Sequence, residues 1–328
     1  MRTSERPRLG PAELVQLTTV ARRFHLDGRS KVQIAEELGL SRFKVARLLE
    51  RAHDEGLVRI EIGRPPEIDT DLSEAVRLRH GYEHVVVADT GESDPAVLRN
   101  EVSRLAGRHL DELVERGDVV GIAWGRSLLS LTGQLTTLPP CIAVQLCGAL
   151  SRPDVSESGI PGVHAVDASS VDVTRRVAEA SGGSAVTFYA PLVVPDADAA
   201  TTLRRDPRIA RALRHYARLS VAVVSIGAWG PGLSTVYDAL TDRERRALRR
   251  EGAVAETCGI VLDGSGRALD PGLRDRTIGV ALGDLRRTRS VVTIAYGEQK
   301  ADAVRAAKAG GVGTSLVTHS ALARRLLA

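Results

Sequence analysis

The sequence predicts an α/β protein of two domains, a small helical domain at residues 1–62 and a Rossmann-like domain with a mainly parallel sheet at residues 63–328. Two observations carry this prediction. From His84 onward, strand-like apolar runs alternate with helical patterns, as in sheets covered by helices on both faces. Before that point, residues 30–55 have the pattern of two short helices and a tight turn, and Gly63-Arg-Pro-Pro66 marks the boundary.

The first domain is organised around a helix-turn-helix pattern. Ser30 and Ser41 are good N-caps for two helices, and Gly39 can adopt the positive φ that ends the first one. Ala35 is small where the second helix must cross closely. The apolar faces of the two helices are Ile34, Ala35 and Leu38, then Val45, Leu48 and Leu49. Such a motif places its second helix in the DNA major groove.

Positive charge is concentrated where that second helix begins, and no acidic residue occurs between Ser41 and Leu49. We therefore expect contacts with double-stranded operator DNA from Ser41, Arg42, Phe43, Lys44, Arg47 and Arg51. A solvated face of an ordinary helical pair is the alternative. The run from Leu57 to Ile62 alternates and predicts a short strand. That strand either forms a wing that brings Arg59 to a phosphate or only closes the domain.

A supporting helix is predicted at about residues 13–25, after a frayed tail at 1–11, and another at 69–80 leads into the second domain. The predicted strands of that domain are Val85–Asp89, Val119–Trp124, Ile142–Cys147, Ala185–Tyr189, Val221–Ile226, Val291–Tyr296 and Ser315–Thr318. Helical patterns lie between them, for example at 97–115, 171–180, 208–219 and 301–309. Asp263-Gly-Ser-Gly266 suits a hairpin loop between two short strands.

Composition excludes several classes of protein. Hydrophobic residues make up 43% of the 328 residues, so the chain is globular, and the 3% of aromatic residues argue against base stacking on single strands. Net charge is only +4, but residues 1–62 carry twelve Lys and Arg against nine Asp and Glu. Cys141, Cys147 and Cys258 have no paired spacing, so we expect reduced core thiols, no metal site and no cofactor. No apolar stretch approaches membrane-spanning length and no signal peptide opens the chain, so a cytoplasmic protein is expected.

Ligands of open parallel sheets bind beyond the carboxyl ends of the strands. After the strand at Val119, Gly125 allows the backbone to approach a ligand, and a helix begins at Arg126 and Ser127. Backbone N–H groups through Leu128, a guanidinium and a hydroxyl would converge there, as a phosphate requires. Other strand ends place Gly148 and Lys300 near this site, and Glu256, near a strand start, could accept hydrogen bonds from sugar hydroxyls. A solvated Lys300 and a surface Glu256 are the alternatives.

With these motifs the chain resembles the SorC-type sugar-binding transcriptional regulators, related to deoxyribonucleoside and central glycolytic gene regulators. The resemblance covers nearly the whole chain. It lies in Lys31–Glu61, Gly117-Asp-Val-Val-Gly-Ile-Ala-Trp-Gly-Arg-Ser-Leu128, Gly252-Ala-Val-Ala-Glu-Thr-Cys-Gly259, Arg276-Thr-Ile-Gly-Val-Ala-Leu-Gly-Asp-Leu-Arg286 and Gly297-Glu-Gln-Lys-Ala-Asp-Ala-Val-Arg-Ala-Ala307.

The resemblance implies a winged helix-turn-helix and an effector domain similar to sugar-phosphate isomerases and glucosamine-6-phosphate deaminase. It implies that a phosphorylated sugar or polyol contacts Gly125, Arg126, Ser127, Gly148, Glu256 and Lys300 and changes operator affinity. The chain departs from the family's pattern in three places. Ser127 replaces a frequent Thr, Glu256 replaces a common Asp, and the loop at Pro231-Gly-Leu-Ser-Thr-Val-Tyr237 is unusual.

The sequence thus predicts a bacterial DNA-binding regulator of a carbohydrate catabolic operon. Two alternatives stay open: a regulator that senses a non-phosphorylated metabolite, and an enzyme similar to sugar-phosphate isomerases or deaminases. An enzyme would need an acid/base pair over its substrate, and no such pair is evident at matching strand ends. Because one chain presents one recognition helix, specific binding should require a homodimer or a homotetramer.

Overall fold

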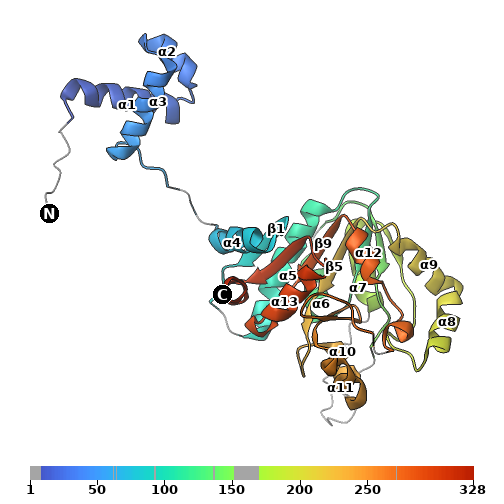
Figure 1. Ribbon diagram of the computed structural model, residues 1–328. Coiled ribbons are helices and arrows are strands. Elements are labelled where there is room, and N and C mark those ends of the chain that lie inside the picture. The colour runs from blue at the N-terminus through green and yellow to red at the C-terminus, as the bar shows by residue number, and fades with distance from the viewer. Residues whose placement is uncertain are drawn as a thin grey trace, which may run out of the picture. The chain divides into compact units, whose positions relative to one another are not determined.

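The computed structural model describes residues 9–328 except 62, 64, 92–93, 136, 151–169 and 271. The chain divides into two compact units, residues 1–63 and 64–328, which are described separately (Figure 1). Most of the expected N-terminal tail and the last residue of the expected wing strand, Ile62, lie outside the described residues. The helix expected at 13–25 begins earlier, with Pro11 in its first turn, where a missing N–H costs nothing.

The N-terminal unit consists of α1 (Pro11–His25), α2 (Lys31–Leu38) and α3 (Arg42–Asp54). The predicted caps are confirmed. The Ser30 hydroxyl accepts the Gln33 N–H while the Gln33 side chain accepts the Ser30 N–H, and the Ser41 hydroxyl accepts the Lys44 N–H. Gly39 ends α2 with φ 63°. The predicted apolar faces pack with α1 into one small core that includes Leu17, Val20, Ile34, Val45 and Leu48.

The strand predicted after α3 is wrong for the residues that the structure describes. Residues 57–61 have no regular secondary structure, and Ile60 is 63% exposed. Alternation alone cannot make a strand, because a strand needs a neighbour to satisfy its backbone N–H and C=O groups. The described part of the N-terminal unit contains only helices and their connections, so it offers no such neighbour and forms no wing.

The C-terminal unit contains a seven-stranded, fully parallel sheet in the order β1-β10-β9-β5-β2-β3-β4, which confirms the predicted α/β class. All seven predicted strands form it, within a few residues at their ends. They are β1 (His84–Ala88), β2 (Val119–Ile122), β3 (Ile142–Gln145), β4 (Ser184–Val186), β5 (Val221–Ser225), β9 (Ser290–Ile294) and β10 (Ser315–His319).

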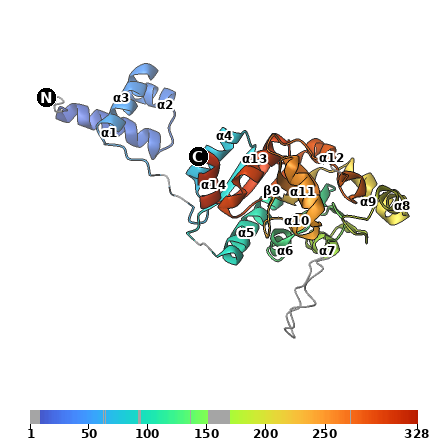
Figure 2. The same ribbon diagram turned by 60° about the horizontal axis from the view of Figure 1, so that its bottom comes forward.

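Helices cover both faces of this sheet (Figures 1 and 2). On one face lie α5 (Pro95–Leu113), α6 (Arg126–Thr132) and α7 (Ser170–Ser181). The other face is covered by α4 (Thr70–His80), α8 (Ala197–Arg205), α9 (Pro207–Tyr216), α12 (Leu282–Arg287), α13 (Ala301–Ala309) and α14 (Ser320–Leu327). Each face of the sheet has its own hydrophobic core, and alternate residues of β5 point to opposite faces. Val221 and Val223 belong to the core under α5, α6 and α7, and Ala222 and Val224 belong to the core on the other face.

A smaller antiparallel sheet contains β6 (Gly227–Ala228), β7 (Ala253–Thr257) and β8 (Ile260–Asp263), with α10 (Thr235–Ala239) and α11 (Asp242–Arg250) between β6 and β7. A hairpin was expected with its loop at Asp263–Gly266. The hairpin in the structure lies earlier in the chain and joins β7 to β8. Its two-residue turn is Cys258-Gly259, and both residues have positive φ, as such turns require. The expected tight turn does exist, held by the Asp263 carboxylate, but the strand after it is reduced to a single bridge at Ala268.

Candidate functional site

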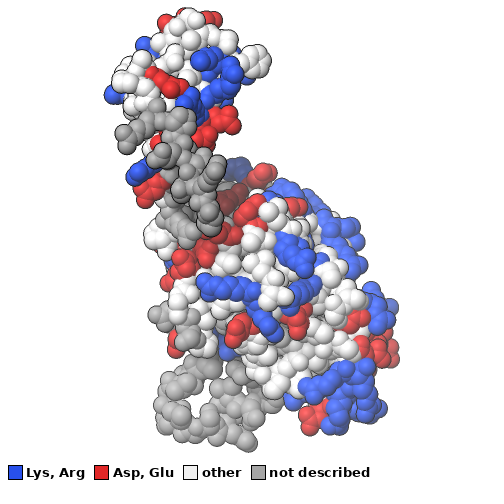
Figure 3. All heavy atoms as spheres, turned by 60° about the vertical axis from the view of Figure 1, so that its left-hand side comes forward, with Lys and Arg blue, Asp and Glu red and all other residues white. Residues whose placement is uncertain are grey.

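The N-terminal unit exposes the basic residues that open α3. Arg42, Lys44 and Arg47 are exposed, and Phe43 is 81% exposed. Within the described residues none of these three cations forms an ion pair, so their charges are available to a polyanion. In Figure 3, Lys and Arg side chains gather on one side of the N-terminal unit. Ser41 caps the helix, so its hydroxyl already accepts the Lys44 N–H at 3.2 Å.

Arg51 and Arg59 are placed differently from the other predicted DNA contacts. The Arg51 guanidinium pairs with the Glu13 carboxylate of α1, so it ties α3 to its supporting helix. Arg59 is exposed in the irregular segment after α3 and has no strand to orient it. The sequence signal for the Arg51 pair was the acidic residue in the first turn of α1, which could only be matched to Arg51 once the helix crossing was known.

In the C-terminal unit the order of the strands determines which loops meet. From β2 the chain continues to β3 and β4 on one side, and from β5 it continues to β9 and β10 on the other. The carboxyl ends of β2 and β5 therefore form the topological switch point, where open α/β sheets bind ligands. A pocket of about 420 Å³ lies at this edge, and both Arg126, which follows β2, and Lys300, which follows β9, line it. We call it the Lys300 pocket.

Lys300 is held as a half-buried cation in this pocket. It caps α13 after a 3-10 turn at Glu298–Lys300, and its ammonium donates to the Ile226 carbonyl oxygen at 3.0 Å. It also lies 5.0 Å from the centre of the Tyr296 ring. Burial, and then the nearby Arg126 charge, lower the pKa of Lys300 to about 8, while Glu256 acts in the opposite direction. Lys300 and Arg126 thus bring two basic side chains to the pocket, whose lining also includes the exposed side chain of Glu298.

Glu256 lies close enough to Lys300 for their charges to interact, but it is not among the described residues that line the pocket. Its carboxylate accepts the Gly259 N–H at 2.8 Å and the Ser234 hydroxyl at 3.1 Å. Burial raises the pKa of Glu256, and these two hydrogen bonds and Lys300 oppose the rise. The unusual loop at 231–237 therefore has two contacts here: Ser234 binds Glu256, and Gly232 and Leu233 line the Lys300 pocket.

Of the residues predicted at the turn after β2, only Arg126 is among the described residues that line the Lys300 pocket, and Gly125, Ser127 and Leu128 are not. Gly125 has φ 138°, which disfavours any other residue, and a Cβ there would lie 3.3 Å from Ser225 Oγ. Arg126 is exposed at the start of α6, while Ser127 is buried and its carbonyl oxygen accepts the Ser103 hydroxyl at 3.0 Å. The Leu128 side chain belongs to the core, so only its backbone N–H can serve a ligand.

Gly148 follows β3, on the other side of β2 from β5 and β9. It is not among the described residues that line the Lys300 pocket. Its N–H donates to the Ile278 carbonyl oxygen at 2.9 Å, and a Cβ would lie 2.5 Å from the Pro191 carbonyl oxygen. The close passage of this neighbouring segment explains why the position is glycine.

The sequence reasoning missed pocket residues from two further strand ends. His319 ends β10, and its Nε2 accepts the Gly297 N–H at 2.9 Å, so the loop that carries Lys300 is fastened to β10. Burial lowers the pKa of His319, which favours the neutral acceptor form. Pro95 and Leu98 reach the pocket from the start of α5. The rule that selected the ends of β2 and β9 would have selected His319 if applied to β10.

All three cysteine thiols are buried. Among the described residues, no group of His, Cys, Asp and Glu could hold a metal ion. The described helices also include none that is both long and apolar enough to cross a membrane.

Comparisons with known proteins cover both units. The family model described as "Putative sugar-binding domain" matches residues 64–328. The chain is 27% identical to the transcriptional regulator YjhU of Escherichia coli strain K12 over 314 residues, 93% of this chain and 92% of that protein. It is 27% identical to the deoxyribonucleoside regulator of Bacillus subtilis strain 168 over 311 residues, 94% and 95% of the two chains.

The structural comparison agrees in fold. The crystal structure of the full-length sorbitol operon regulator SorC from Klebsiella pneumoniae superposes with a TM-score of 0.72 and 22% identity, covering 97% of this chain and 100% of that one. The match to the family model extends over most of the chain and includes the whole of the sheet and the Lys300 pocket. The chain therefore belongs to the SorC-type family of regulators with a sugar-binding domain.

Proposed function

We propose that this protein is a DNA-binding transcriptional regulator of a carbohydrate operon. In this proposal α3 reads operator DNA, and a phosphorylated sugar or polyol in the Lys300 pocket changes the affinity for that DNA. The observation that carries the ligand assignment is the meeting of Arg126 and Lys300 in one pocket at the switch point of the sheet. Two cations, with backbone N–H groups at the start of α6, favour an anionic group over a neutral hydroxyl.

The relatives support the DNA-binding half of the proposal, since they are named as transcriptional regulators, including a deoxyribonucleoside regulator and a sorbitol operon regulator. The chemistry of the site supports a binding role over an enzymatic one. Glu256 has both carboxylate oxygens engaged by Gly259 and Ser234, and the Lys300 ammonium is bonded to a carbonyl oxygen. A proton-transfer pair would instead need both groups free to face a substrate.

Thermal scans and calorimetry of the full chain test the ligand class. Pentose, hexose and polyol phosphates are compared with their free forms, with inorganic phosphate as a further control. A ligand at 100 times its dissociation constant stabilises the folded state by about 2.7 kcal/mol, which raises the melting temperature. We expect this shift in melting temperature only from phosphorylated compounds. Arg126→Ala and Ser127→Ala should reduce the shift, whereas Arg246→Ala, at an exposed position of α11, should not. Equal shifts from free and phosphorylated sugars would instead favour a sensor of a non-phosphorylated metabolite.

An NMR assay of the same compounds with the protein tests the enzyme alternative. We expect no isomerisation or deamination above the uncatalysed rate. Turnover that disappears in Lys300→Gln would show that the pocket performs chemistry and would overturn the non-enzymatic assignment.

A further inference from the structure

A second, larger cavity in the C-terminal unit is separate from the Lys300 pocket. Its volume is about 720 Å³, and none of the described residues that line it also lines the Lys300 pocket. Its walls come from α8, β8, the turn at 264–269, the 3-10 helix at Arg274–Arg276, and α12. We call it the arginine pocket, because four arginines line it: Arg204, Arg267, Arg274 and Arg286.

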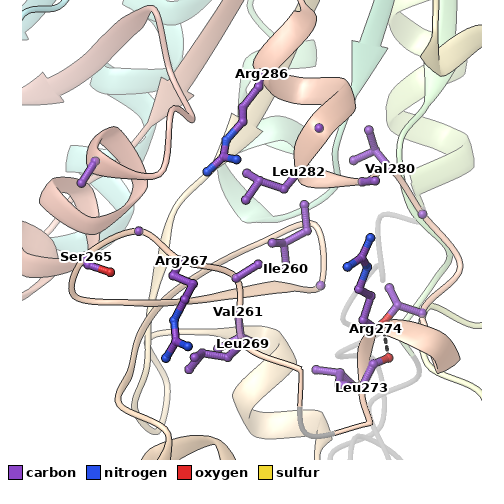
Figure 4. A pocket seen from close by; sticks show the side chains of 18 of the residues that line it. Ile260, Val261, Ser265, Arg267, Leu269, Leu273, Arg274, Val280, Leu282 and Arg286 are labelled. Atoms are coloured by element: carbon purple, nitrogen blue, oxygen red, sulfur yellow. Dashed lines mark hydrogen bonds between the residues drawn. The ribbon is translucent and has the colours of Figure 1, made fainter.

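The lining combines this positive charge with aliphatic walls. The aliphatic side chains are Ile260, Val261, Leu269, Leu273, Val280 and Leu282 (Figure 4). Among the described lining residues there is no Asp or Glu. A cavity that is both apolar and cationic suits a ligand with one anionic end and one apolar end, because each half then meets a matching surface.

Some polar side chains of the lining already have hydrogen-bond or ion-pair partners, and others do not. Arg204 donates to the Thr277 carbonyl oxygen at 2.8 Å, and Arg267 pairs with Asp263 at 3.0 Å. The two lining hydroxyls are also engaged, with Thr277 donating to Leu273 and Ser265 to Asp263. The lining therefore has few groups left that could recognise the hydroxyls of a neutral sugar.

Two guanidinium groups remain available. Arg286 uses Nε to donate to the Gly310 carbonyl oxygen at 2.7 Å, which leaves its terminal nitrogens. The Arg274 side chain forms no hydrogen bond or ion pair with any described residue. Its bonds are all through the backbone, with the N–H donating to Asp270 and the carbonyl oxygen accepting the Thr277 N–H. In Figure 4, Arg274 and Arg286 extend into the pocket from opposite sides, with Leu282 and Ile260 between them, while Arg267 points away.

We propose that the arginine pocket is a second ligand site, for a small organic anion. Its carboxylate or phosphate group binds the free guanidinium nitrogens of Arg274, and its aliphatic or aromatic body packs against Leu282 and the neighbouring aliphatic wall. Arg286 adds positive charge on the other side of that wall. An inorganic anion would leave that wall in contact with water, and an uncharged apolar molecule would leave the guanidinium groups without a partner.

Isothermal titration of the full chain tests the site with octanoate and octyl phosphate as probes. Octan-1-ol keeps only the apolar body and acetate only the anionic end. We expect one octanoate or octyl phosphate per chain, bound about tenfold or more tighter than either control, since each control loses one half of the recognition. The tighter of the two probes identifies the preferred anionic group. Equal affinity for octan-1-ol and octanoate, or no saturable binding of either probe, would overturn the proposal.

Variants locate the probe. Arg274→Gln should weaken octanoate about tenfold, and because Arg274 is exposed and without a side-chain partner among the described residues, this change should not disturb folding. Arg211→Gln, at an exposed position of α9 outside the lining, is the matched control and should have no effect. Lys300→Gln should also leave octanoate binding unchanged, and loss of binding there would place the probe in the Lys300 pocket and overturn the assignment.

A second copy of the chain is the competing occupant. If the probes do not bind and Arg274→Glu changes the sedimentation of the unliganded protein, the arginine pocket is a surface between copies and not a ligand site. Neither DNA nor a sugar phosphate enters these experiments, so their outcome does not depend on the function proposed above.

Discussion

The two units of this protein place positive charge in opposite ways. On α3, Arg42, Lys44 and Arg47 are exposed and have no ion-pair partner within the described residues. In the Lys300 pocket the cation is half-buried and bonded to a carbonyl oxygen, and its pKa is lowered to about 8. Exposed charges are screened by salt, whereas an amine that is partly removed from water is screened less and has a lowered pKa. The helix should therefore respond to ionic strength and the pocket to pH.

The largest effect should come from removing the exposed cations of α3. In Arg42→Ala/Lys44→Ala/Arg47→Ala, each lost base contact should cost ~1–3 kcal/mol and each lost phosphate contact should flatten the salt dependence. Operator affinity should fall at least about 100-fold in electrophoretic mobility-shift titrations at several salt concentrations.

The matched control removes the same charge elsewhere: Arg208→Ala/Arg211→Ala/Arg218→Ala, three exposed arginines on or just after α9. It should retain operator affinity. If both triple variants lose operator affinity to the same extent, binding depends on net charge and α3 is not the recognition helix.

The second effect concerns Lys300. Lys300→Met keeps most of the side-chain volume but removes the buried charge. It should leave operator binding intact and abolish the response to a phosphorylated sugar, a coupling of typically ~1–3 kcal/mol. Footprinting with and without ligand measures both quantities on one sample. A clearly lower melting temperature of the ligand-free variant would instead assign Lys300 a structural role through its bond to Ile226.

The third effect is a pH dependence that only the pocket should show. A bound phosphate stabilises the Lys300 ammonium, so ligand affinity should fall as pH rises above about 8, by up to about tenfold per pH unit. Calorimetry at pH 7 to 10 measures this, and Lys300→Met should give a flat profile above pH 7. An equally steep fall in the variant would place the titrating group elsewhere.

The lowered pKa of Lys300 also affects the stability of the protein without ligand. In the unfolded chain a lysine keeps its proton up to its ordinary pKa of 10.5, while the folded protein releases the Lys300 proton near a pKa of about 8. The unfolded state therefore binds more protons between these values, and the Lys300 contribution to stability should rise with pH across that window. Comparing denaturant midpoints of wild type and Lys300→Met at pH 8 and 10 isolates this contribution.

The smallest effect concerns the helix cap of α2 in the N-terminal unit. Ser30→Ala removes the capping box of α2 and should cost about 1 kcal/mol, while Ser30→Asp should retain the cap. Hydrogen exchange of the full chain should show faster exchange of the α2 amides and unchanged exchange in β5 and β9. A loss of protection in both units would contradict the view that each has its own core.

The contrast also explains which predictions succeeded. Helix positions and caps in the N-terminal unit depend on residues three or four apart, so Ser30, Gly39 and Ser41 could be assigned from sequence alone. The predicted strand at 57–62 failed in its described part because a strand depends on a distant neighbour, and alternation does not reveal whether one exists. The hairpin failed for a related reason: two turn-forming segments follow each other, and only packing decides that Cys258-Gly259 joins the strands.

The sequence by itself determined the α/β class, the seven strands of the parallel sheet and the exposed cations of α3, because hydrophobic period and capping residues act over short distances. Only the tertiary structure decided the order of the strands, and with it which strand ends share a pocket. Gly125 and Lys300 are brought to one edge because β9, β5 and β2 are neighbours in the sheet, while Gly148, beyond β3, packs against Pro191. Burial, which lowers the pKa of Lys300, depends on contacts between segments far apart in the chain.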